Sequence, residues 1–202
     1  MLSHELQRNP GLRHDGLTGT VLLAESHLAI HTWPESGFVT LDVYGCSVHI
    51  ADGFNFIKSS TDRYDLIILD LTDPGGPSTP LYTAGFYEGC AARLKSGGIL
   101  GLHIASPFAQ PQRIVKTLTS LKQAFDIVRP YMVTVPLSGG PWMMACASNT
   151  LDPAKLAATA VDTRLSTRCV TGLQFYNGST HCAAMALPNF VRATVLKTGA
   201  CL

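Results

Sequence analysis

The sequence predicts an α/β protein in which helices pack on a mostly parallel sheet, with a short β segment at the start of the chain. From about residue 47 onward, short apolar runs of strand length alternate with amphipathic segments of helix length. The residues before this point instead contain runs rich in β-branched side chains, bounded by glycine. With 202 residues, the chain is long enough to bury one main core.

The N-terminal part predicts two strands around a central segment. Residues 18–24 and 38–44 are rich in β-branched and apolar residues. They flank residues 26–34, which are therefore expected to lie on or between strands. Residues 1–15 have mixed charge and no clear period, which indicates a flexible lead-in.

The rest of the chain alternates strands and helices, the pattern of a mostly parallel sheet. Residues 66–69 form an apolar run typical of a strand buried on both faces. Further strands are expected at residues 47–51, 99–104, 127–135 and 142–147. Helical segments are expected at residues 53–60, 86–94, 112–124 and 152–168, with one more helix start near residues 187–189.

Composition restricts the class of ligand. The net charge is +1, charged residues make up only 14% of the chain, and there is no run of Lys or Arg. This argues against binding to nucleic acid or to an anionic membrane and favours a small neutral or cationic substrate. The apolar runs are too short to span a membrane. The polar residues 1–15 lack the apolar region of a secretory signal, so we expect a cytoplasmic location.

The cysteines show no pattern of a metal or disulfide site. No CxxC pair and no Cys/His ligand spacing occurs, which argues against a zinc site and against a disulfide framework. The six residues are Cys46, Cys90, Cys146, Cys169, Cys182 and Cys201.

Two carboxylates follow the apolar run at residues 66–69. Asp70 and Asp73 stand where the carboxyl end of a parallel strand would be, the edge at which open sheets bind ligands. Carboxylates there can hold an amine and accept its proton. Alternatively they cap a helix or brace a turn, because Asp-Pro-Gly sequences are common turn formers. His103 follows the residues Ile99 to Leu102 in a similar way, but a lone histidine at a strand's carboxyl edge is more often structural.

The segment Tyr64-Asp65-Leu66-Ile67-Ile68-Leu69-Asp70-Leu71-Thr72-Asp73-Pro74-Gly75-Gly76-Pro77 resembles the spermidine synthases, which are polyamine aminopropyltransferases. The resemblance runs from about Val48 to Val195 and includes Asp52-Gly53 and Leu81 to Tyr87. Agreement in order and spacing over this length favours homology over a chance turn motif.

This resemblance implies a Rossmann-like, methyltransferase-like fold and aminopropyl transfer from decarboxylated S-adenosylmethionine to putrescine, without a cofactor. It also implies that Asp70 accepts the proton of the attacking amine and that Asp73 helps to hold the diamine. The acidic side chain of Asp52-Gly53 would bind the adenine amino group.

Three features of the family are missing. The chain runs from Tyr44-Gly45-Cys46 directly into Ser47-Val48, so a glycine-rich loop of the G-G-G-D-G-G kind and the acidic residue for the ribose are absent. The tyrosine expected after Val135-Pro136 is also not present. A partial sheet leaves an apolar edge, so we expect a homo-oligomer or another partner to cover it.

The segment Leu23-Ala24-Glu25-Ser26-His27-Leu28-Ala29-Ile30-His31-Thr32-Trp33-Pro34-Glu35 resembles the self-cleavage site of the bacterial S-adenosylmethionine decarboxylases. This resemblance implies that the Ser26 hydroxyl attacks the Glu25 carbonyl and that the Glu25-Ser26 bond is then cut. Ser26 would become a pyruvoyl group, the electron sink for decarboxylation.

The same resemblance assigns four further residues. His31 matches the processing histidine, and Cys46, twenty residues after Ser26, matches the cysteine that protonates the product carbon. Glu35 would accept hydrogen bonds from the substrate ribose. Thr18 stands where the family usually has a serine that assists processing.

Together these motifs predict a decarboxylase-like segment at residues 1–46 and a spermidine synthase-like region at residues 47–202, with material missing at the junction near Cys46. Three functions follow as hypotheses. The first is aminopropyl transfer in spermidine biosynthesis, and the second is pyruvoyl-dependent decarboxylation of S-adenosylmethionine. The third is an inactive fragment that binds an intact polyamine enzyme through its sheet edge.

Overall fold

The computed structural model describes residues 18–23, 26–33, 38–44, 53–71, 76–136 and 139–201. The chain divides into two compact units, which are described separately. The first contains residues 1–60 and 71–81, and the second contains residues 61–70 and 82–202.

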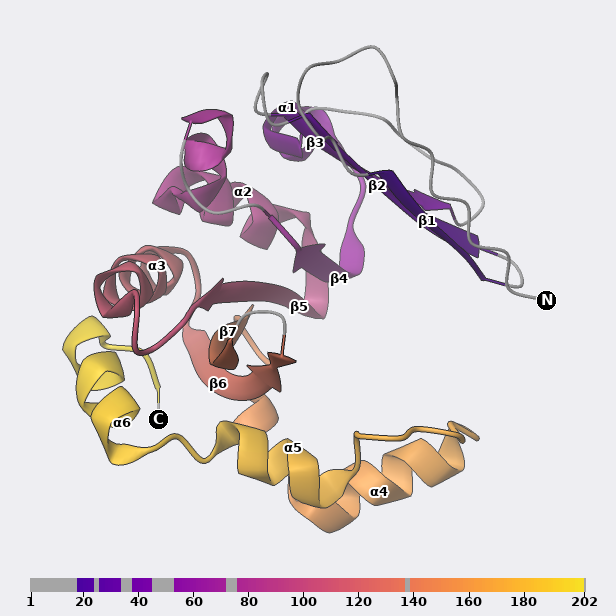
Figure 1. Cartoon of the computed structure of the whole chain (residues 1–202), viewed down its shortest axis with the longest axis vertical. Helices are drawn as coiled ribbons and strands as arrows, with labels where there is room; N and C mark the ends of the chain where they lie inside the picture. The colour runs from indigo at the N-terminus through magenta and orange to yellow at the C-terminus, as the bar shows by residue number, and fades with distance from the viewer. Residues whose placement is uncertain are drawn as a thin grey trace. The chain divides into compact units, whose positions relative to one another are not determined.

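The first unit contains a three-stranded antiparallel sheet in the order β1-β2-β3 (Figure 1). Its strands are β1 (Thr18–Leu23), β2 (Ser26–Trp33) and β3 (Phe38–Tyr44). The two flanking strands agree with the sequence prediction, and the segment between them is itself a strand. A short helix, α1 (Gly53–Ser59), and most of a 3-10 helix, η1 (Gly76–Tyr82), also belong to this unit.

The second unit contains a four-stranded sheet in the order β4-β5-β7-β6. Its strands are β4 (Tyr64–Leu69), β5 (Leu94–Ala105), β6 (Ile127–Val135) and β7 (Gly140–Ser148). β4 pairs in parallel with β5, and β7 is antiparallel to both β5 and β6, so β4, β5 and β6 all run in one direction. Three of the four described strands of this sheet therefore share one direction, as predicted for a mostly parallel sheet. The exception is β7, which must run antiparallel to β6 because a short loop connects the two strands.

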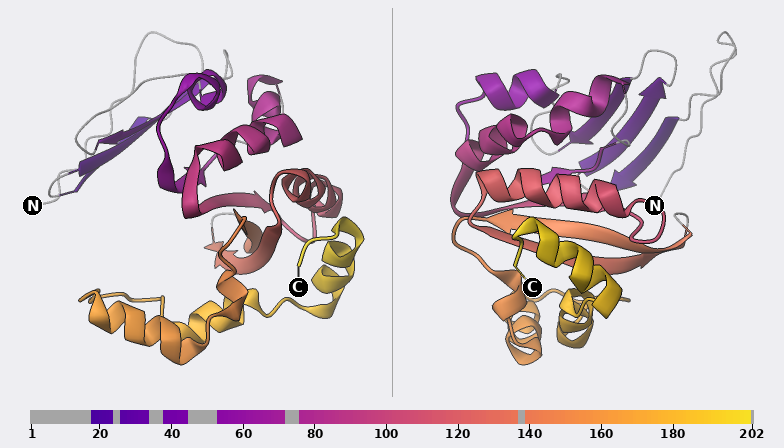
Figure 2. Two further views of the ribbon diagram at one scale, coloured as in Figure 1. Left: turned by 180° about the vertical axis from the view of Figure 1, so that it is seen from behind. Right: turned by 90° about the vertical axis from the view of Figure 1, so that its left-hand side faces the viewer.

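The described residues of the second unit also form five α-helices. They are α2 (Ala84–Arg93), α3 (Pro111–Ala124), α4 (Ala158–Thr167), α5 (Gly178–Met185) and α6 (Asn189–Val195), with the 3-10 turns η3 (Pro153–Lys155) and η4 (Leu196–Thr198). α3 contacts β5, β6 and β7, and it lies between α2 and α6 (Figure 2). Within the described residues, no helix combines the length and the apolar character needed to cross a membrane.

The core forms where α3 packs on β5. One face of α3 is buried because its apolar residues recur at helical spacing. On β5, every second residue is buried, as expected of a strand with one face under a helix. The buried residues are Ile114, Leu118 and Leu121 from α3 and Leu100, Leu102 and Ile104 from β5. Each such side chain contributes about 1.5 to 3 kcal/mol to stability.

The prediction that residues 66–69 are buried on both faces is wrong. The side chains of Leu66 and Ile68 are 55% and 65% exposed, although Leu69 is buried. Within the described sheet, β4 is an edge strand whose one hydrogen-bonded neighbour is β5. An apolar run predicts burial on both faces only where layers cover both faces of the strand, and the described residues leave one face of β4 uncovered.

The helix predicted at residues 152–168 is interrupted. Asp152 accepts a hydrogen bond from the Ala154 amide and begins η3 instead of an α-helix. α4 starts only at Ala158. The sequence analysis also missed α5, although Asn177 and Thr180 form the reciprocal capping box that marks its start.

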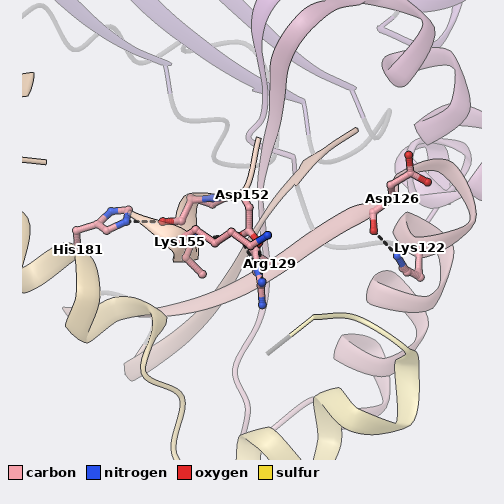
Figure 3. Close-up of polar contacts among 8 residues, drawn as sticks. Lys122, Asp126, Arg129, Asp152, Lys155 and His181 are labelled. Atoms are coloured by element: carbon pink, nitrogen blue, oxygen red, sulfur yellow. Dashed lines mark hydrogen bonds and ion pairs between the residues drawn. The ribbon is translucent and has the colours of Figure 1, made fainter. Parts of the chain in front are cut away.

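Asp152 also forms a nearly buried ion pair with Arg129 of β6 (Figure 3). The Arg129 Nε donates to Asp152 Oδ1 at 2.7 Å and the Arg129 Nη2 donates to Oδ2 at 2.6 Å, a bidentate geometry. The two side chains are 12% and 7% exposed. This pair attaches the chain after β7 to the outer strand of the sheet.

Replacement of Asp152 by Ala should lower the free energy of unfolding by about 3 to 5 kcal/mol, because it leaves a nearly buried guanidinium without its partner. Urea denaturation measures this change. The matched control is Asp65→Asn, which removes an exposed pair of 2.8 Å with Lys95. The control should cost about 1 kcal/mol or less. Equal effects of the two variants would contradict the structural role of the buried pair.

The same ion pair predicts a pH dependence of stability. Hydrogen bonds from Arg129 hold the pKa of Asp152 below its ordinary value. A carboxyl group with a lowered folded-state pKa stabilises the protein above its unfolded-state pKa of about 4, and this contribution is lost as the pH falls through the folded-state pKa. The unfolding free energy of the wild type should therefore fall more steeply below about pH 4 than that of Asp152→Ala. Urea titrations at successive acidic pH values test this expectation.

Candidate active site

Two titratable side chains meet at the carboxyl edge of the second unit's sheet. Asp70 directly follows β4, and the pairing of Leu69 with Leu102 brings His103 of β5 beside it. The Oδ1 atom of Asp70 lies 3.8 Å from Nε2 of His103. The Asp70 side chain is 69% exposed, whereas that of His103 is 18% exposed. The carboxylate is thus open to a ligand and the imidazole lies mostly covered next to it.

Trp142 extends this group from a third strand. β7 runs antiparallel to β5, so its first residues lie at the edge where β5 ends. The ring centroids of Trp142 and His103 are 6.4 Å apart with an angle of 34° between their planes. A carboxylate, an imidazole and an indole from three strands therefore lie at one edge of the sheet.

This combination suits a cationic ligand. A carboxylate can bind an ammonium group and accept a proton from it, and aromatic rings attract cations through their faces. No cluster of three or more His, Cys, Asp or Glu residues suited to a metal ion occurs in the described part of the chain. The edge therefore offers the chemistry of amine binding and proton transfer.

A cavity of about 250 Å³ lies at the opposite end of β4 and β5. Its lining includes Arg63, Lys95, Gly98 and Ser148, all of which already have partners, since Arg63 donates to the carbonyl of Leu94. Lys95 pairs with Asp65, and the Ser148 hydroxyl donates to the carbonyl of Gly98. Ligands of open α/β sheets bind at the carboxyl ends of the strands, so this cavity is not the candidate active site.

The positions of the other predicted transferase residues relative to Asp70 are not described. Asp73 and Asp52 lie outside the described residues, and Gly53 is the first residue of α1 in the other compact unit. Their predicted roles therefore stay predictions. His103 was set aside in the sequence analysis as a structural histidine, although its position directly after an apolar run was a usable signal. No sequence signal marked Trp142, because it reaches this edge only through the antiparallel pairing of β7 with β5.

The predicted processing residues lie partly on β2. Ser26 is the first residue of this strand, and the strand register pairs His31 with Thr18 of β1. Cys46 and Glu35 lie outside the described residues. The backbone thus brings together two of the positions assigned to self-cleavage and leaves the others untested.

Comparison with solved structures identifies the fold. A crystal structure of spermidine synthase in complex with the transition-state analogue AdoDATO matches with a TM-score of 0.65, covering 96% of this chain and 98% of that one at 18% identity. The spermidine synthase of Thermotoga maritima matches with a TM-score of 0.62, at the same identity and covering 96% and 97% of the two chains. The predicted fold of the aminopropyltransferases is therefore confirmed.

Curated relatives are aminopropyltransferases by name. The polyamine aminopropyltransferase of Nitrosomonas europaea is 45% identical over 145 residues, which cover 72% of this chain and 45% of the relative. Polyamine aminopropyltransferase 2 of Hyperthermus butylicus is 37% identical over 180 residues, which cover 88% of this chain and 57% of the relative. The chain thus spans about half the length of these relatives.

Family models match both resemblances that were inferred from the sequence. Residues 3–61 match the model of S-adenosylmethionine decarboxylase. Residues 36–156 match the model of the spermine/spermidine synthase domain, which is more than half of the chain. The two matches overlap and are consistent with a fusion, and the chain belongs to the spermine/spermidine synthase family.

Proposed function

We propose that the protein acts in spermidine biosynthesis by transferring an aminopropyl group from decarboxylated S-adenosylmethionine to putrescine. The observation that carries this proposal is the exposed carboxylate of Asp70 at the carboxyl end of β4, in a chain of the spermine/spermidine synthase family. The site needs no cofactor, because the sulfonium of the donor already activates the carbon that is attacked.

The reaction assigns one task to Asp70. The incoming amine is protonated and has no free lone pair, so its proton must first pass to the Asp70 carboxylate. The freed nitrogen then attacks the carbon next to the sulfonium, a C–N bond forms, the C–S bond breaks, and its electron pair stays on sulfur. In this proposal Asp73 helps to hold the diamine.

We expect this chain to bind the nucleoside of the donor weakly. In the proposal, Asp52 binds the adenine amino group from its position before Gly53 of α1. The sequence holds no glycine-rich loop that would approach the methionine-derived part of the donor. We therefore expect slow turnover with a high KM for the donor, unless an oligomer partner completes the nucleoside site.

A second candidate function is decarboxylation of S-adenosylmethionine through a pyruvoyl group made from Ser26. The match of residues 3–61 to the decarboxylase family supports this candidate, as does the pairing of His31 with Thr18 on adjacent strands. The pyruvoyl group would supply the electron sink for loss of carbon dioxide. His31 and Thr18 would assist its formation, Cys46 would donate the proton to the product carbon, and Glu35 would bind the ribose.

A third candidate is binding to an intact polyamine enzyme without catalysis. The exposed apolar side chains of Leu66 and Ile68 on the edge strand β4 support this candidate. It predicts no turnover of either substrate and association with a full-length aminopropyltransferase, which light scattering detects.

Replacement of Asp70 by Asn should lower aminopropyl transfer by about 100-fold or more, because the amide cannot accept the amine proton. Chromatographic measurement of spermidine formed from decarboxylated S-adenosylmethionine and putrescine tests this. Asp65→Asn is the matched control, since Asp65 is an exposed carboxylate near the opposite end of the same strand. Unchanged turnover in Asp70→Asn would refute the assignment of Asp70 as the base.

Replacement of Ser26 by Ala tests the second candidate. If Ser26 is processed, the wild-type protein should separate under denaturing conditions into two chains divided between Glu25 and Ser26, the larger with a pyruvoyl end. The variant should give one species of the full 21.6 kDa, because the hydroxyl that attacks the Glu25 carbonyl is missing. Intact-mass spectrometry distinguishes the two. A single full-length species in the wild type would exclude self-cleavage.

A further inference from the structure

The position of His103 is not explained by binding of an amine to Asp70 alone. Its Nε2 atom faces the Asp70 Oδ1 atom at 3.8 Å, and its ring lies beside that of Trp142. The imidazole is mostly covered while the carboxylate is open to solvent. A ligand that reaches Asp70 from solvent would therefore have the imidazole behind the carboxylate.

The proposed transfer calls for a second proton acceptor next to Asp70. An alkylammonium group holds its proton far more strongly than a carboxylic acid does, so a carboxylate by itself keeps that proton only briefly. Imidazole is in general a stronger base than carboxylate by roughly two pKa units. A neighbouring imidazole would therefore prolong the time for which the amine stays deprotonated and able to attack.

We propose that Asp70 and His103 form a proton-accepting pair in which the carboxylate takes the amine proton and passes it, through one water molecule that bridges the 3.8 Å between them, to Nε2 of His103. This inference rests on the proposed aminopropyl transfer. The neutral amine then forms the C–N bond, the C–S bond breaks, and the sulfonium becomes a thioether. The positive charge lost from the reacting ammonium resides on the imidazole, which forms an ion pair with the Asp70 carboxylate until solvent removes the proton.

The surroundings of His103 are compatible with this role. Asp70 faces it from β4, and the nearby residues of β7, namely Trp142, Met143 and Met144, carry no charge. Two titratable residues of the neighbouring strands stay neutral near pH 8. Burial raises the pKa of Cys146 to about 11 and that of Tyr131 to about 12.

Replacement of His103 by Gln tests the proton transfer in the assay for spermidine formation. Gln keeps a polar side chain of similar reach, but it cannot hold a proton. We expect kcat to fall by at least about 10-fold while KM for putrescine changes by less than about 2-fold. Wild-type kcat in His103→Gln would overturn the proposal.

Chemical rescue separates proton transfer from a packing role. In His103→Ala, added imidazole should restore part of the lost rate in proportion to its concentration. It should not restore Asp70→Asn, in which the first proton acceptor is missing. If His103 only supports Trp142 or the strand, imidazole will not restore the rate, and the proposal is then wrong.

A measurement that does not depend on turnover keeps the two proposals distinguishable. The NMR signal of the His103 ring proton is compared at one fixed pH in the wild type, in Asp70→Asn and in the control Asp65→Asn. Loss of the facing carboxylate should move this signal, and the control should leave it in place.

A moved signal in a protein without transfer activity would support the pairing and contradict the proposed function. An unmoved signal in Asp70→Asn would overturn the pairing whatever the activity.

Discussion

The pairing of β5 with β4 on one side and with β7 on the other determines where the side chains of the candidate active site lie. Parallel pairing with β4 aligns the carboxyl ends of the two strands, so Asp70 and His103 become neighbours. Antiparallel pairing with β7 brings the start of that strand, and with it Trp142, to the same edge. The core under β5, formed with α3, holds this register because a slip by one residue would expose Leu100, Leu102 and Ile104.

The C-terminal segment that follows β7 is attached to this sheet by polar contacts. The Arg129–Asp152 pair joins the chain after β7 to β6, and His181 of α5 continues the connection. The Nε2 atom of His181 donates to the carbonyl of Pro153 at 2.9 Å, so the Nδ1 atom of the neutral ring accepts from the Tyr176 hydroxyl at 2.9 Å. Near the C-terminus, the amide of Cys201 donates to the carbonyl of Val128 on β6. The loss of one partner in this group leaves others unsatisfied, which makes its members interdependent.

One face of β4 carries exposed apolar side chains. Leu66 and Ile68 are the kind of side chains that a sheet normally covers, and the chain spans about half the length of its curated relatives. In the proposed transfer, the edge that would accept the amine proton depends on contacts within the second compact unit, whereas the glycine-rich loop expected for the nucleoside is not found in the sequence.

The sequence by itself determined the α/β class, the exact extent of β6, and the position of Asp70 at a strand end, because these depend on local periodicity and on which residue follows an apolar run. It also identified the two families through runs of adjacent residues. Tertiary structure alone decided that β7 inserts antiparallel between β5 and β6, that β4 is an exposed edge, and that residues 152–168 break into η3 and α4. Each of these depends on partners distant in the sequence: a neighbouring strand, a covering layer, or Arg129 for Asp152. In the sequence His103 is an isolated histidine, and only the pairing of β4 with β5 brings it beside Asp70.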